Sequence, residues 1–114
     1  MRTVLIVDDY RPFLDSARGL LEGGDFDVVG EAEDGREALR LAAELRPEVV
    51  LLDVHMPDLD GFEVARQLAE LESPPVVVLT SSRDDYASLV GDSAAHAFLR
   101  KDALSAETLQ EALP

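Results

Sequence analysis

Short apolar runs alternate with helical patterns along the whole chain. Five runs are β-branched or aromatic enough to form strands: residues 3–7, 27–32, 49–52, 76–79 and 95–99. Three of them are apolar at consecutive positions rather than at every second position. This pattern is typical of strands that are buried on both faces of a parallel sheet.

Helical spacing of apolar residues fills the segments between these runs. Helices are predicted over residues 11–21, from the turn at 33–35 to about 45, from 61 to the SPP at 73–75, from the SSRDD segment to about 90, and from about 106. The residues expected to face inward in the first three are Phe13, Ala17, Leu20, Leu21, Ala38, Leu41, Ala42, Leu45, Phe62, Ala65 and Leu68.

Strand and helix alternate five times, which predicts an α/β fold with right-handed crossovers. We expect residues 1–114 to form a single doubly wound domain, with a parallel sheet in the order 2-1-3-4-5 and five helices, as in flavodoxin-like proteins. The last helix would have only about eight residues, fewer than the usual ~11–12. We therefore expect either that the chain was cut after Pro114 or that a further segment normally follows.

The charge of the chain limits its partners. The formal net charge is −14 and there is no Cys. Nucleic-acid binding needs clustered Lys and Arg, so this domain is not expected to bind nucleic acid itself. No apolar run approaches the roughly 20 residues of a membrane span. The lack of Cys agrees with a reducing cytoplasm, where we expect the protein.

Polar side chains stand at the ends of the expected strands. Asp8 and Asp9 follow the first strand, Asp53 the third, Thr80 the fourth and Lys101 the fifth. Because the carboxyl ends of neighbouring parallel strands meet in one crevice, we expect these groups to converge. Three carboxylates this close repel one another unless a cation lies among them, and an all-oxygen ligand set favours Mg²⁺, with Mn²⁺ as the related choice.

The stretch LLDVHMPDLDG, residues 51–61, ends a buried strand on Asp53. A carboxylate held there could act as an oxygen nucleophile on a phosphoryl group and form an acyl phosphate. Lys101 would offset the charge of the phosphoryl oxygens, and Thr80 would hydrogen-bond one of them. The first loop, VDDYRPF, has no glycine-rich anion cradle, which argues against a nucleotide or flavin enzyme.

Four motifs follow one another at suitable spacing: VLIVDD at 4–9, LLDVHMPDLDG at 51–61, VVVLTS at 76–81 and AFLRK at 97–101. Together they cover nearly the whole chain, which resembles the receiver domains of bacterial two-component response regulators. The segments VVGEAEDGREAL and RKDALSAETLQEAL are similar to the NarL/FixJ-type branch. Receivers of that branch usually precede a helix-turn-helix DNA-binding domain, so the resemblance implies a transcriptional output outside these residues.

The resemblance implies a phosphorylation-dependent switch rather than an enzyme. Asp53 would be the phosphoacceptor, and Asp8 and Asp9 would hold Mg²⁺ together with Asp53 and the backbone carbonyl of His55. The donor would be a phosphohistidine on a sensor histidine kinase or a phosphotransfer protein. The domain would assist its own phosphotransfer and the slow hydrolysis of its aspartyl phosphate.

Further roles follow from the same resemblance. Thr80 would be the switch hydroxyl, Lys101 would contact the phosphoryl group, and Phe98 would be the aromatic that changes rotamer. Family members often dimerise, so a homodimer is one expected partner. A separate hypothesis, based on position alone, is that His55 and Ser82 flank the path of an attacking water, which predicts that changing either residue alters the lifetime of the aspartyl phosphate.

One alternative function belongs to a different class. The chain could be a protein-interaction module that docks constitutively and leaves its acidic pocket unused, as pseudo-receivers do. That hypothesis predicts normal partner binding by Asp53→Ala, whereas a phosphorylation switch requires the carboxylate.

Overall fold

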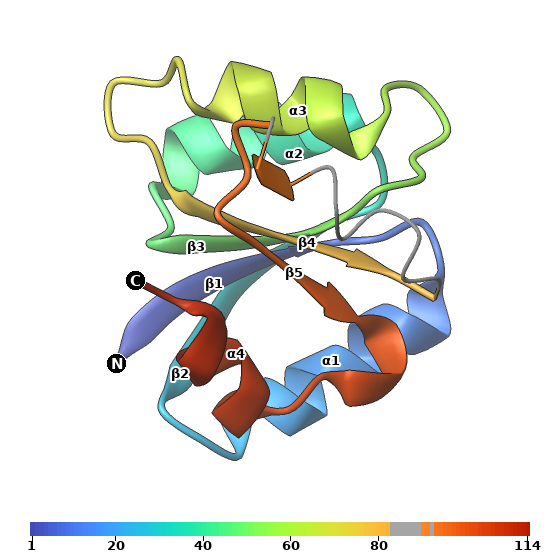
Figure 1. The fold of residues 1–114 in the computed structure, drawn as a ribbon, viewed down its shortest axis with the longest axis vertical. Helices are drawn as coiled ribbons and strands as arrows, with labels where there is room; N and C mark the ends of the chain where they lie inside the picture. The colour runs from blue at the N-terminus through green and yellow to red at the C-terminus, as the bar shows by residue number, and fades with distance from the viewer. Residues whose placement is uncertain (83–89, 92) are drawn as a thin grey trace.

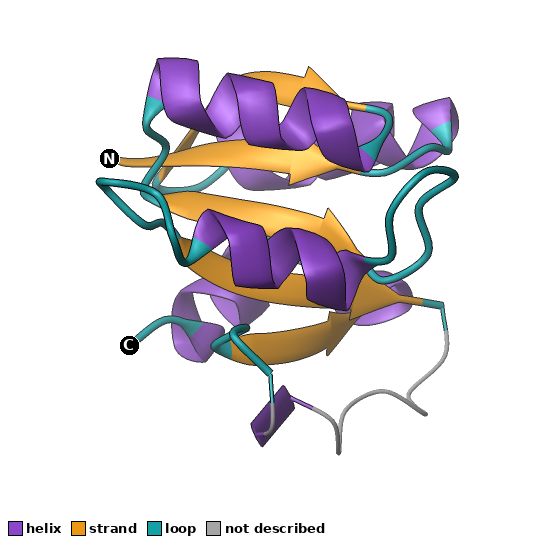
Figure 2. Ribbon diagram, turned by 90° about the horizontal axis from the view of Figure 1, so that it is seen from above, coloured by secondary structure: helices purple, strands orange, loops and turns teal. Residues whose placement is uncertain are grey.

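The computed structural model describes residues 1–82, 90–91 and 93–114. These residues form a five-stranded parallel sheet in the order β2-β1-β3-β4-β5. The strands are β1 (Arg2–Val7), β2 (Phe26–Ala32), β3 (Val49–Asp53), β4 (Val76–Ser81) and β5 (Ala97–Arg100). Figure 2 shows all the strand arrows pointing the same way, so the carboxyl ends of the strands lie at one edge of the sheet. The predicted fold class and strand order are confirmed.

Helices cover both faces of this sheet. The described residues hold α1 (Arg11–Glu22), α2 (Gly35–Leu45), α3 (Gly61–Leu68) and α4 (Ala106–Ala112), with a 3₁₀ turn, η2, at Lys101–Ala103. Helices α2 and α3 lie on one face and α1 and α4 on the other (Figure 1). This two-sided cover explains why the inner strands are apolar at consecutive positions.

Local signals in the sequence set where the helices begin. The side chains of Asp34 and Asp60 accept a hydrogen bond from the backbone N–H three residues on, at the starts of α2 and α3. Ser105 does the same for α4 and forms a reciprocal capping box with Thr108. Such caps satisfy N–H groups that have no partner within the helix. The starts of these helices were therefore readable from the sequence.

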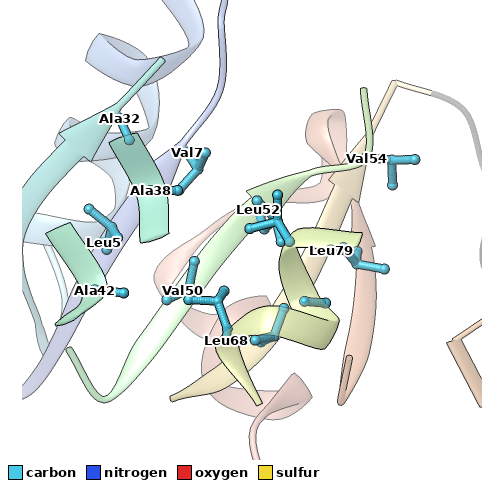
Figure 3. Packing of buried hydrophobic residues seen from close by; sticks show 13 residues of the cluster. Leu5, Val7, Ala32, Ala38, Ala42, Val50, Leu52, Val54, Leu68 and Leu79 are labelled. Carbon is cyan, nitrogen blue, oxygen red and sulfur yellow. The ribbon is translucent and has the colours of Figure 1, made fainter. Parts of the chain in front are cut away.

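The core consists of two apolar clusters, one on each face of the sheet. Leu5 and Val7 of β1 belong to the cluster beneath α2 and α3, which Figure 3 shows at close range. Val4 and Ile6 of the same strand belong to the cluster against α1 and α4. Successive side chains of a strand point to opposite faces, so one apolar strand supplies both clusters.

Some expectations about the helices were wrong, and one lies outside the described residues. The described part of the chain holds four α-helices, and the further helix expected from the SSRDD segment to about Val90 falls mostly on residues 83–89, which the structure does not describe. Helix α3 ends at Leu68, before the prolines that were expected to stop it. Leu20 and Leu45 are 45% and 41% exposed rather than inward-facing. The buried stripe of α1 instead runs through Leu14, which shifts Leu20 to the edge of the buried face.

The last strand begins two residues later than predicted, at Ala97 instead of residue 95. The backbone N–H of Val77 donates to Nδ1 of the His96 ring at 3.1 Å, and the N–H of His96 donates to the Val77 carbonyl at 2.8 Å. The imidazole thus takes the place of a backbone acceptor on the open side of β4. Ladder pairing between the two strands starts only after this contact, with Val78 opposite Ala97.

Candidate functional site

Three carboxylates meet at the carboxyl edge of the sheet. Asp8 follows β1 directly and Asp53 is the last residue of β3, and these two strands are neighbours. One carboxylate oxygen from each of Asp8, Asp9 and Asp53 lies within 4.8 Å of the others. Asp8 is fully buried and Asp53 is 4% exposed, whereas Asp9 faces solvent. The structure therefore confirms the prediction that these three acidic residues lie close together.

Lys101 supplies positive charge to this acidic cluster. Its Nζ lies 2.6 Å from Oδ2 of Asp8 and 3.6 Å from Oδ2 of Asp53. The residue opens the 3₁₀ turn η2 immediately after β5, so the strand end carries its side chain towards the acids. The ammonium also lies 5.0 Å from the centre of the Phe13 ring, within cation–π range.

Backbone donors hold two of the carboxylates in place. The N–H of Tyr10 donates to Oδ1 of Asp8 at 2.9 Å, and the N–H of His55 donates to Oδ1 of Asp53 at 3.3 Å. Both donors lie two residues beyond the acid that they contact, so each acid is fixed by its own turn. The remaining oxygens, Oδ2 of both residues, are the ones directed to Lys101.

The environment of Asp53 disfavours its charged form. Burial raises the pKa of this carboxyl to about 6, the neighbouring Asp8 adds to the increase, and Lys101 opposes it. Repulsion between carboxylates in a buried site is relieved when a cation is shared between them. The raised pKa of Asp53 therefore reflects its burial first and the neighbouring Asp8 carboxylate second, and Lys101 offsets these two effects only in part.

Thr80 stands beside Asp53 in the next strand of the sheet. The two residues are direct partners in the β3–β4 ladder. The Thr80 hydroxyl is fully buried, and it has no hydrogen-bond partner among the residues that the structure describes. A buried polar atom in this position is costly unless it gains a partner in another state or from a ligand. It is therefore a candidate donor to a group attached at Asp53.

The other predicted residues lie around the same edge. Phe98 is half-buried, pairs with Leu79 across the β4–β5 ladder and packs against the core cluster under α2 and α3. The side chains of His55 and Ser82 are exposed, directly beyond Asp53 and β4. The structure thus places these residues next to the site, and their individual roles stay predictions.

The loop between β3 and α3 folds tightly onto Asp53. The N–H of Gly61 donates to the Val54 carbonyl at 2.7 Å, which closes the loop at its base. A Cβ at Gly61 would lie 2.6 Å from the carbonyl oxygen of Asp53 and 2.8 Å from Cα of Val54. Only glycine leaves room for this approach, because those neighbours are backbone atoms.

The donor set fits a hard divalent cation. Asp8, Asp9 and Asp53 offer carboxylate oxygens, and neither His nor Cys joins them in the cluster that the described residues form. Mg²⁺ prefers such oxygen ligands and usually keeps several waters. Asp9 lies on the solvent side and so leaves the cluster open to water.

The sequence prediction missed one residue in contact with the site and one contact of the loop beside it. Phe13 was expected only as an inward-facing helix residue, yet its ring lies beneath the Lys101 ammonium. Asp58, in the loop after β3, reaches the start of α2 with both carboxylate oxygens. Neither role has a signal in residue spacing, because each depends on segments that are brought together only by the fold.

Comparison with known proteins identifies relatives over almost the whole chain. The family described as response regulator receiver domain matches residues 4–113. The chain is 39% identical to the transcriptional regulatory protein YdfI of Bacillus subtilis, over 96% of this chain and 52% of that protein. It is 42% identical to the positive alginate biosynthesis regulatory protein of Pseudomonas aeruginosa, over 96% of this chain and 45% of that protein. The chain thus spans about half the length of these curated relatives.

Solved structures with the same fold include receiver domains of response regulators. The signal receiver domain of the response regulator NarL from Mycobacterium tuberculosis superposes with a TM-score of 0.88 at 33% identity, covering 96% of this chain and 94% of that one. Among the described residues, no helix has the length and apolar character needed to cross a membrane.

Proposed function

We propose that this chain, which belongs to the family of response regulator receiver domains, is a signalling switch phosphorylated on Asp53 in a Mg²⁺-dependent reaction. The main support is that Asp8, Asp53, Thr80 and Lys101, separated in sequence, share one pocket. Asp8, Asp9 and Asp53 would hold the cation with the backbone carbonyl of His55. When bound, the cation would offset the charge of the phosphoryl oxygens.

The proposed reaction is a phosphoryl transfer from a phosphohistidine. A carboxylate oxygen of Asp53 attacks the phosphorus, the new O–P bond forms, and the P–N bond to the imidazole breaks. The bonding electrons leave with the imidazole nitrogen, which takes up a proton. Lys101 lies 3.6 Å from Asp53 Oδ2 and can shift from Asp8 towards the phosphoryl oxygens. A sensor histidine kinase or a phosphotransfer protein would supply the phosphohistidine.

The response to phosphorylation would begin at Thr80. Its buried hydroxyl would donate to a phosphoryl oxygen and so gain the partner that it lacks among the described residues. Movement of Thr80 towards Asp53 frees space near Phe98, which packs one strand further along the sheet. Two conformations a few kcal/mol apart suffice for a phosphoryl group to bias such a switch. Because the matched relatives include transcriptional regulatory proteins, we propose transcription as the process it controls.

The test is direct phosphorylation by a small acyl phosphate with Mg²⁺, read by intact-protein mass. We expect the wild type to gain one phosphoryl group, and we expect Asp53→Asn, or the wild type with a chelator, to gain none. Asp102→Asn is the matched control, because Asp102 is an exposed acid beside Lys101 that pairs with Arg100. An unmodified wild type, or full modification of Asp53→Asn, would contradict the proposal.

A further inference from the structure

The loop that follows the phosphoacceptor strand is tied to the beginning of α2 by one side chain. Oδ1 of Asp58 accepts the backbone N–H of Gly35 at 2.8 Å, and Oδ2 accepts the N–H of Arg36 at 3.0 Å. Oδ1 also accepts the N–H of Leu59 in its own loop at 2.9 Å. Each carboxylate oxygen of Asp58 thus accepts a hydrogen bond from a residue 22 or 23 positions away in the sequence. The pKa of Asp58 is lowered by these backbone hydrogen bonds, that from Gly35 first.

The packing around Gly35 is independent support for this tie. A Cβ on Gly35 would lie 2.9 Å from Cγ2 of Val64, 3.0 Å from Cβ of Leu59 and 3.2 Å from Oδ1 of Asp58. Gly35 is buried, so the first turn of α2 lies directly against the loop and the start of the core face of α3. The close packing at Gly35 and the hydrogen bonds from Asp58 thus join the loop to the same turn of α2.

The contact reaches the acidic pocket through very few residues. Asp58 is separated from His55 only by Met56 and Pro57, and the proline ring fixes one of the backbone angles between them. The base of the loop is already closed by the Gly61 N–H on the Val54 carbonyl. Asp58 holds the far side, so the backbone of His55 lies between two anchored points.

We propose that Asp58 is a positioning residue, which holds the His55 backbone in the geometry needed for cation binding by anchoring the β3–α3 loop to α2. The proposal rests on the proposed function, because it assigns the His55 carbonyl to the cation. It goes beyond that function by making α2 part of the support of the pocket. A partner that binds to α2 and displaces it would then also change the geometry of the acidic pocket, because Asp58 connects the two.

A simpler role for Asp58 would be to cap α2 and nothing more. The chain offers a matched control for that role, because the Asp34 carboxylate also lies at this helix terminus and accepts a hydrogen bond from the N–H of Glu37 at 2.8 Å. Asp34 belongs to the helix's own cap and is not part of the β3–α3 loop. Asp34→Ala and Asp58→Ala therefore remove the same charge from the same helix end, and only the second releases the loop.

The experiment compares wild type, Asp34→Ala, Asp58→Ala and Asp58→Asn. Mg²⁺ affinity is measured by calorimetry on the unphosphorylated proteins, and exchange of the His55 amide, which donates to Asp53, is measured by NMR. For Asp58→Ala we expect Mg²⁺ affinity to fall about tenfold, the size typical of lost support for a ligand, and the His55 amide to exchange faster. Asp34→Ala should keep both near wild type, and Asp58→Asn, with one acceptor left, should recover part of each.

Each result has a distinct meaning. Equal losses in the two alanine variants would overturn the positioning role, because they would trace the effect to α2 alone. Wild-type affinity and exchange in Asp58→Ala would overturn it as well. If the wild type took up no Mg²⁺, the proposed function would fail, while faster His55 exchange in Asp58→Ala alone would still show that Asp58 orders the loop. Thermal unfolding of all variants confirms that the comparison is made on folded protein.

Discussion

At the scale of single residues, the pocket combines buried side chains held by hydrogen bonds with side chains that are exposed to solvent. Asp8 and Asp53 are buried and accept backbone hydrogen bonds, so their orientation is fixed within the folded chain. Asp9, His55 and Ser82 lie on the solvent side. This division separates the chemistry of bond formation, which needs fixed geometry, from access of water, which depends on exposed side chains.

A residue-scale prediction concerns the lifetime of the aspartyl phosphate. We expect His55→Ala and Ser82→Ala each to shorten its half-life a few-fold, because smaller side chains leave the attacking water an easier path, while Mg²⁺ affinity stays nearly unchanged. Dephosphorylation can be followed by mass after removal of the acyl phosphate. Ser73→Ala, an exposed serine beyond α3, is the control and should keep the wild-type half-life. Unchanged lifetimes in both pocket variants would retire the prediction.

At the scale of secondary-structure elements, the loop between β3 and α3 is held in place by both hydrogen bonding and close packing. Gly61 starts α3, closes the loop onto Val54 and lies against the backbone of Asp53. Helix α4, by contrast, is short and is held by its capping box and by burial of Leu109. The site therefore depends more on the loop that follows β3 than on the length of any helix.

An element-scale prediction compares two glycines. Gly61→Ala should lower the free energy of unfolding by about 1–3 kcal/mol, because the added methyl group overlaps backbone atoms that cannot move freely. Its phosphorylation should also slow, since the Asp53 backbone is displaced. Gly19→Ala in α1 has no heavy atom within 4 Å of the added Cβ, so it should stabilise the protein by up to about 1 kcal/mol. Urea unfolding measures both, and equal effects would contradict the steric argument.

At the scale of the whole molecule, the parallel sheet concentrates negative charge at one edge. The formal net charge is −14, and within it Asp8 and Asp53 are buried, where solvent screens their repulsion less than at the surface. Their repulsion is a cost to folding that a bound cation or a proton relieves. The free energy of unfolding of the whole domain should therefore depend on the charge state of the buried acids.

The pH dependence of unfolding tests this at the molecular scale. Because the pKa of Asp53 is raised from 3.8 to about 6 in the folded chain, the folded state holds more protons between these values, and stability is lost as pH rises through that window. Without Mg²⁺, Asp53→Asn should be more stable than wild type at pH 7 by roughly 1–2 kcal/mol, allowing for solvent screening. The difference should vanish near pH 3.8 or below.

Denaturant unfolding of both proteins at several pH values measures this difference. Comparing the variant with wild type cancels other groups, such as Glu63, whose pKa is lowered to about 2 mainly by its hydrogen bond from Arg66. Added Mg²⁺ should raise the stability of the wild type more than that of Asp53→Asn, because it binds the folded acids. A difference between the two proteins that is constant with pH would show that Asp53 titrates normally.

Residue periodicity predicted the alternation of strands and helices and the burial of β1, β3 and β4 on both faces. The strand order was expected from the usual arrangement of such sheets, and no pattern in the chain specifies it. With that order, the rule that parallel strands end together predicted that Asp8, Asp9, Asp53, Thr80 and Lys101 meet at one edge. The boundary residues of α3 and β5 did not follow, because His96 replaces a backbone partner and Leu68 ends its helix without a proline. The tie from Asp58 to α2 and the ring of Phe13 under Lys101 were decided only by the tertiary structure, since contacts between distant segments leave no local pattern in the chain.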